Sequence, residues 1–121
     1  MLDFENLDPQ VSFFVDEFID SFITWDMILF FHENPYTVGS SSSIAMSIGR
    51  LGADIEPYLE KLSEKGILTR EYRPGDGADV IFAYKPQPEF EKMVAEFKRA
   101  LKDRASRLII VSKVLQKEAR R

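Results

Sequence analysis

The sequence predicts a mainly α-helical protein that carries one small β-hairpin. Apolar residues recur at helical spacing within residues 9–33, 44–48 and 54–65, and again from residue 89 to about residue 119. Two strand-like stretches, 67–72 and 80–84, flank a Gly-rich turn. The chain has 121 residues, which is near the usual size of a single domain.

The composition is that of a globular protein without thiol chemistry. The chain is 45% hydrophobic and 30% charged, with no Cys and one His. Disulfides and thiolate sites are therefore excluded, and a His-rich metal site is not expected. The single histidine, His32, lies beside Glu33, and no nucleophile motif accompanies it. We expect no enzymatic activity, no catalytic residues, no cofactor and no metal site.

No segment of the sequence suggests a membrane or an export signal. The first ten residues are acidic and lack the basic and apolar regions of a signal peptide. The longest apolar runs, at 27–31 and 108–111, are far shorter than the roughly 20 residues that a membrane span needs. We expect a cytoplasmic protein with no membrane partner.

Charge is distributed unevenly along the chain. The net charge is −4, but residues 1–66 carry 12 acids and 3 bases, whereas residues 67–121 carry 8 acids and 13 bases. A nucleic-acid-binding protein usually has a basic footprint on its reading face. Here most of the positive charge follows the predicted hairpin.

The N-terminal helical region begins at Asp8-Pro9, where an N-cap acceptor precedes a proline at the first helical position. Ser21 or Thr24 could cap a second helix, so residues 9–33 form either two helices or one bent helix. Asn34-Pro35 ends the region, because proline disfavours helix in the residue before it.

A second group of short elements follows. Residues 36–38 are β-prone, and Ser41 or Ser42 is expected to cap a short helix that Gly49 closes. Asp54 can cap the next helix, with Pro57 at its third position and Gly66 at its end. The hairpin then has strands at 67–72 and 80–84, with the turn at 73–78.

The C-terminal segment is predicted as one helix from Glu89 to about Ala119, because it contains no Gly or Pro. Such a helix of about 30 residues would be ~45 Å long and would need a second surface to pack on. Its apolar residues fit an a/d repeat with Arg104 in one d position. The run 108–111 with Val114 is apolar nearly all round, which implies more than one neighbour.

The central part of the chain resembles the winged helix-turn-helix transcriptional regulators of the MarR, PadR and TrmB-like kind. The resemblance covers Trp25 to Tyr84, with 16 residues between Gly49 and Gly66. The matching residues are Ala45, Ile48, Gly49, Ile55, Leu59, Leu62 and Gly66-Ile67-Leu68. We expect an N-terminal helical extension at 1–23, a winged-helix domain at 24–86, and a long C-terminal helix at 87–121 that mediates dimerisation.

Such regulators bind duplex DNA, and the resemblance places the contacts on the second motif helix, the serine run and the hairpin. The residues that would contact DNA here are Ser41, Ser42, Ser43, Arg50, Lys61, Arg70, Arg73, Gly75, Gly77 and Lys85. The second motif helix departs from the family pattern, because it carries Asp54, Glu56, Glu60 and Glu64 with few bases. These acids oppose the electrostatic attraction that supplies most DNA affinity. The alternative is a winged helix that binds a basic protein partner through this acidic helix.

The terminal helices are expected to form a homodimer. The C-terminal helix would pack on its symmetry mate and on the Phe-rich N-terminal helix, and a small effector could be enclosed there. The expected dimerisation residues are Phe14, Phe18, Phe97, Leu101, Leu108, Val111 and Leu115.

Overall fold

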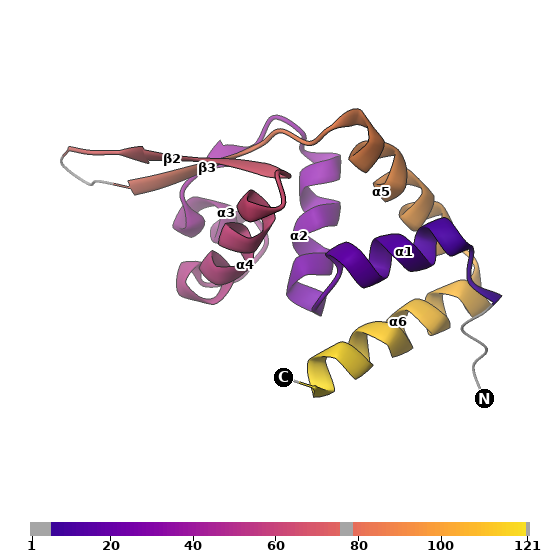
Figure 1. Cartoon of the computed structure of the whole chain (residues 1–121). Coiled ribbons are helices and arrows are strands. Elements are labelled where there is room, and N and C mark those ends of the chain that lie inside the picture. The colour runs from indigo at the N-terminus through magenta and orange to yellow at the C-terminus, as the bar shows by residue number, and fades with distance from the viewer. Residues whose placement is uncertain (1–5, 76–78, 121) are drawn as a thin grey trace. The chain divides into compact units, whose positions relative to one another are not determined.

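The computed structural model describes residues 6–75 and 79–120. The chain contains the following elements, shown in Figure 1: α1 (Pro9–Phe18), α2 (Phe22–Glu33), β1 (Val38–Gly39), α3 (Ser41–Ser47), α4 (Gly52–Glu64), β2 (Leu68–Arg73), β3 (Asp79–Tyr84), α5 (Pro88–Ala100) and α6 (Arg104–Ala119). None of the described helices is both long and apolar enough to cross a membrane.

The chain divides into two compact units. The terminal unit consists of Met1–Trp25 together with Pro88–Arg121, and the central unit is Asp26–Gln87. The division falls within α2. The N- and C-terminal segments thus belong to one unit.

The central unit is a winged helix, as the sequence predicts. The strand order is β1-β3-β2 and both pairings are antiparallel, so that β2 and β3 form the hairpin, or wing, that follows α4. The unit is held by a shared apolar core, in which the rings of Phe31 and Tyr84 stack with centroids 5.3 Å apart. The buried residues of α3, α4 and the wing are Ile44, Ala45, Ile55, Leu59, Leu62, Leu68, Phe82 and Tyr84.

Two glycines end the motif helices. Gly49 has a φ of +71° and Gly66 a φ of +79°, a backbone region that favours glycine. After α3, the amide of Arg50 donates to the carbonyl of Ala45 at 2.9 Å; after α4, Ile67 donates to Leu62 at 3.0 Å. These bonds are typical of Schellman motifs and satisfy carbonyls that the helix end would otherwise leave unpaired.

The start of α4 differs from the prediction. The helix begins at Gly52, with Leu51 in the N-cap position and no capping side chain. Asp54 therefore lies in the first turn, and Pro57 lies in the second turn, inside the helix. A Cβ added to Gly52 would meet the backbone of Ser42, at 3.1 Å from its Cα. Gly52 thus lies where α4 approaches α3 closely, at a position with little room for a side chain.

The terminal unit is built around an aromatic cluster. Phe14 contacts Phe18, Phe90 and Phe97, with ring centroids 5.5, 5.7 and 5.2 Å apart. Trp25 meets Phe97 edge-on at 5.3 Å. Rings at these separations gain stabilisation beyond that of their buried area.

The single C-terminal helix predicted over 89–119 is wrong, because the segment forms two helices. The break lies at Leu101-Lys102-Asp103. Asp103 is the N-cap of α6. Its carboxylate accepts hydrogen bonds from the backbone amide of Ser106 at 3.0 Å and from the Ser106 hydroxyl at 2.8 Å. These hydrogen bonds, with the nearby charge of Arg107, lower the pKa of the Asp103 carboxyl.

The N-terminal region is two helices rather than one bent helix. The Ser21 hydroxyl accepts from the amide of Thr24 at 3.1 Å and so caps α2. The Glu118 carboxylate of α6 accepts from the Phe22 amide at 2.9 Å. Lys117 donates to the carbonyls at the end of α1, including that of Val15 at 2.6 Å. Adjacent residues of α6 thus place an acid at one helix N-terminus and a base at one C-terminus, where each is favoured.

Candidate nucleic-acid interface

The serine run leads into α3. The cap is Ser40, not Ser41 or Ser42: its hydroxyl accepts from the amide of Ser43 at 3.2 Å. Ser41 is half-buried, whereas Ser42 and Ser43 are exposed. Two serines of the three predicted to contact DNA therefore reach the surface.

Arg50 lies in the turn between α3 and α4, and it is paired. One of its guanidinium nitrogens lies 2.7 Å from a carboxylate oxygen of Asp26. The pair ties the turn to α2 within the central unit. An approaching phosphate would have to compete with Asp26 for this arginine.

The outer face of α4 lies opposite its buried stripe of Ile55, Leu59 and Leu62. The exposed residues of the helix are Ala53, Asp54, Glu56, Pro57, Lys61 and Glu64. Lys61 is the one base among them, so this face is acidic. Over the whole central unit, nine acids and six bases give a net charge of −3.

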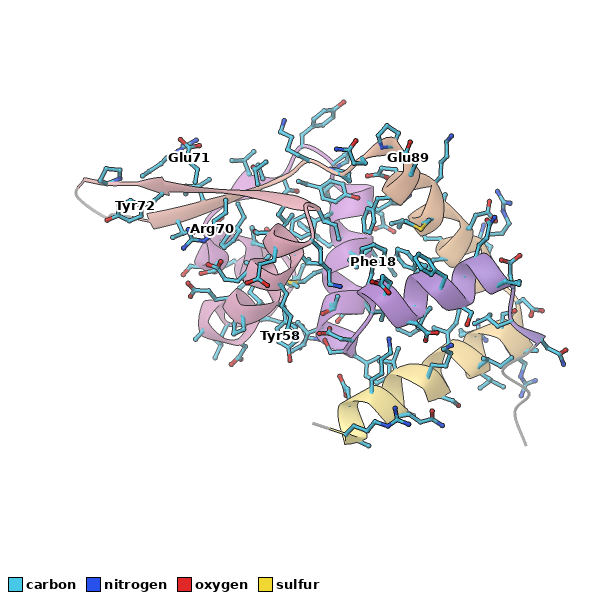
Figure 2. The ribbon with its side chains drawn as sticks, in the orientation of Figure 1. Phe18, Tyr58, Arg70, Glu71, Tyr72 and Glu89 are labelled. Atoms are coloured by element: carbon cyan, nitrogen blue, oxygen red, sulfur yellow. The ribbon has the colours of Figure 1, made fainter. Side chains whose placement is uncertain are left out.

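The register of the wing separates its two arginines. Arg70 pairs with Phe82 across the ladder and Tyr72 pairs with Val80, so both share a face with the buried Phe82. Figure 2 shows Arg70 and Tyr72 on the side of the hairpin toward α4, and Glu71 on the opposite side. Arg73 alternates with Tyr72 and lies on the face of Glu71.

Each wing arginine has an acidic partner. The Arg70 Nε lies 2.9 and 2.8 Å from the two carboxylate oxygens of Glu60 on α4. Arg73 lies 3.6 Å from Glu71, a looser contact. Glu60 was predicted as one of four acids on this helix that oppose DNA binding, and its contact with the wing was not predicted. The side chains of Arg70 and Glu60 are both partly exposed, so the pair is accessible from solvent.

The remaining predicted contact residues lie at the ends of the wing. Gly75 is exposed at the tip with a φ of +140°, and Lys85 is exposed just after β3. Gly77 lies outside the described residues. Lys61, the other exposed lysine predicted to contact DNA, is on α4 and thus on a different element from Lys85.

Two large apolar side chains of the motif are exposed, and neither was predicted as part of a binding surface. Met46 on α3 is 83% exposed and Leu51 in the turn is 71% exposed. Both residues lie just outside the i, i+3/i+4 apolar stripes of the predicted helices, and this position in the sequence could have indicated their exposure. The surface of the motif is thus apolar and acidic rather than basic.

The predicted dimerisation residues divide into two groups. Phe14 and Phe97 are fully buried inside one chain, so their assignment to a dimer surface is wrong. Phe18 and Leu101 are half-buried. On α6, by contrast, Leu108 is 47% exposed and Leu115 is 53% exposed.

The described part of the chain contains no group of three or more acidic or histidine side chains that could hold a metal ion.

Comparisons with protein-family models and with curated proteins find no match. Among solved structures, the chain is similar to a protein described as "Possible transcriptional regulator from Methanosarcina mazei Go1". The two are 18% identical, with a TM-score of 0.49, over 72% of this chain and 73% of that chain.

Proposed function

We propose that the chain is a winged-helix DNA-binding protein, a transcriptional regulator of the MarR, PadR and TrmB-like kind that acts as a homodimer. The observation that carries this proposal is the pairing of α4 with the inner face of the wing. Arg70 and Tyr72 lie on the face of the wing toward α4, and Arg70 contacts Glu60 of that helix. In this arrangement α4 could enter the major groove of duplex DNA while the wing contacts the adjacent phosphate backbone.

The width of an α-helix and the ion pairs of α4 support a binding mode in which contacts to the DNA phosphate backbone dominate. An α-helix is about 10–12 Å across and enters a major groove about 12 Å wide. Glu60 is neutralised by Arg70, and Asp54 lies in the first turn of α4, where an acid is favoured. Lys61 and Lys85 would then supply about two phosphate contacts, so log K would fall with log salt at a slope of about −2. Arg70, whose charge is shared with Glu60, would add a weaker contact.

The outer stripe of α6 supports the dimer. Ile109, Ile110 and Val114 are buried on one side of the helix. Leu108, Val111 and Leu115 follow one another at i, i+3 and i+7 on the opposite side. A helix that is apolar on two opposite faces needs two neighbours, and a second copy of α6 supplies an equally apolar stripe in a two-fold pairing.

Binding of labelled duplex fragments, followed by fluorescence anisotropy at low salt, tests the DNA proposal. Arg70→Ala should weaken binding while the protein stays folded. Arg99→Ala, which removes an exposed and ion-paired arginine from α5, should leave binding unchanged. The absence of any anisotropy change with a pool of duplexes at low salt would contradict DNA binding.

Light scattering on the purified chain tests the dimer. The wild-type particle should have twice the 14.0 kDa mass of one chain. Replacing Leu108 and Leu115 by Ser should give a monomer. Val38→Ser, a matched change of an exposed apolar residue in the central unit, should not. A wild-type particle of 14.0 kDa at micromolar concentration would refute the dimer.

A second function is favoured by the exposed Met46 and Leu51 beside the acids of α4. An apolar and acidic surface complements a protein partner with a basic amphipathic helix. In that case Leu51→Ser and Glu56→Lys should each abolish capture of such a partner, and Leu51→Ser, which changes no charge, should not alter binding to duplex DNA. Capture that survives both changes would exclude this surface.

A further inference from the structure

A groove in the terminal unit lies between α1 and α5. It has a volume of about 460 Å³, which is within the range of small-molecule sites. Its lining residues come from the first two turns of each helix: Pro9, Gln10, Phe13, Glu89, Lys92 and Met93. Nothing in the proposed DNA surface uses these residues.

The lining is mainly apolar and centres on Phe13. This side chain is 55% exposed, whereas its neighbour Phe14 is fully buried in the aromatic cluster. Met93, half-buried on α5, lines the same groove. The exposed ring of Phe13 and the flexible thioether of Met93 form an apolar surface. An apolar ligand group that packs on this surface would be stabilised by its removal from water.

Two opposite charges lie at this groove on one face of α5. Glu89 and Lys92 are three positions apart, which places their Cβ atoms about 5–6 Å from each other. Both are exposed, and within the described chain neither forms an ion pair or a side-chain hydrogen bond. Figure 2 shows Glu89 in the first turn of α5. A carboxylate and an ammonium at this spacing complement a ligand that carries one charge of each sign on a single carbon.

We propose that the groove binds a free α-amino acid with a large apolar side chain. The ligand ammonium pairs with Glu89, its carboxylate pairs with Lys92, and its side chain lies on Phe13 and Met93. A nucleic acid or an anionic membrane surface would require several bases without the adjoining carboxylate. A residue within a peptide chain lacks the paired charges. This inference goes beyond the proposed function and does not depend on it.

Isothermal titration of the full-length chain with L-phenylalanine and L-leucine tests the proposal in the absence of DNA. Both should bind saturably, and L-serine should not, because it has no apolar side chain. N-acetyl-phenylalanine, which lacks the ammonium, and phenylalaninamide, which lacks the carboxylate, should each bind at least about tenfold more weakly. No saturable binding of either amino acid up to about 10 mM would overturn the proposal. Equal binding of the acetylated compound would also overturn it, because the groove would then recognise only apolar surface.

Variants assign the site. Phe13→Ser, Glu89→Gln and Lys92→Met should each weaken phenylalanine binding by about tenfold. Glu96→Gln and Lys102→Met, charge-matched controls elsewhere in the terminal unit, should not. Because Phe13 and both charges are exposed, thermal melts of these variants should match the wild type. If Phe13→Ser instead converts a dimer into a monomer, a second copy of the chain covers the groove and the amino-acid assignment is wrong.

Discussion

Replacing Glu60 by Gln tests whether the contact between the wing and α4 limits DNA binding. In the free protein, Arg70 is held by both carboxylate oxygens of Glu60, at 2.9 and 2.8 Å. For Arg70 to reach a phosphate, this contact has to be broken or shared. Glutamine keeps the length and polarity of the side chain and removes its charge. The substitution should therefore release Arg70 without disturbing the core of the central unit.

The size of the effect follows from the exposure of the pair. The Arg70 and Glu60 side chains are 45% and 34% exposed, so water screens their attraction. Exposed ion pairs contribute about 0.2–1 kcal/mol to stability. Removing this competition should therefore strengthen DNA binding by up to about fivefold, since 1.4 kcal/mol corresponds to a factor of ten. If Arg70 then gains a full phosphate contact, the salt slope should steepen by about 0.9.

Anisotropy titrations with one duplex at four or more salt concentrations measure both quantities. Glu64→Gln is the matched control, because it removes an acid from the same helix that lies on the outer face and does not contact Arg70. It should reproduce the long-range charge effect but leave the salt slope unchanged. The double variant with Arg70→Ala should abolish the gain from Glu60→Gln. Equal affinities and slopes for Glu60→Gln, Glu64→Gln and wild type would refute the reasoning.

Three further changes test the terminal unit. Phe97→Ala should lower the free energy of unfolding by about 3–5 kcal/mol in urea denaturation, because it opens a cavity in the aromatic cluster, whereas Phe13→Ala should have little effect. Lys117→Met should cost about 1–2 kcal/mol through the lost hydrogen bonds to the α1 carbonyls, and an unchanged midpoint in the same assay would contradict that role. Asp103→Ala should lower the melting temperature measured by circular dichroism. Because the pKa of Asp103 is lower in the folded state, its contribution is fully present above its unfolded pKa of about 3.9 and is lost as pH falls through its folded pKa. A difference in melting temperature between variant and wild type that does not narrow as the pH is lowered through this range would argue against a role of the carboxylate charge.

Local sequence chemistry accounts for most of the central unit. Gly49 and Gly66 mark the ends of α3 and α4, because each supplies a positive φ at a helix end. The apolar stripe of Ile55, Leu59 and Leu62 is buried as its periodicity indicates. These features depend on neighbours within a few residues, so the sequence pattern is sufficient to predict them.

Two helix boundaries could not be predicted from the spacing of apolar residues. The start of α4 has no capping side chain, and it coincides with the contact of Gly52 with the backbone of Ser42 on α3. The break before α6 had a local signal in Asp103 and Ser106, but the apolar pattern continues across it. A heptad count alone cannot distinguish a continuous helix from two helices that bury similar stripes.

The division between burial and surface required the tertiary structure. Phe13 and Phe14 are adjacent, yet one is 55% exposed and the other is fully buried, because α1 turns only Phe14 toward Phe90 and Phe97. In the same way, the strand register sends Arg70 toward α4 and Arg73 to the opposite face of the wing. Adjacent or similar residues thus acquire different roles according to the direction in which the backbone projects them.

By itself the sequence determined the winged-helix arrangement, the acidic character of α4 and the absence of thiol chemistry, because these follow from residue type and short-range spacing. Only the tertiary structure decided which charged side chains are paired with one another and which are free to contact a ligand. Arg50 meets Asp26, and Arg70 meets Glu60, across 24 and 10 positions of the chain. Such pairs form where separate elements are brought together by packing, and their energies depend on distance and exposure in the folded protein rather than on spacing in the sequence.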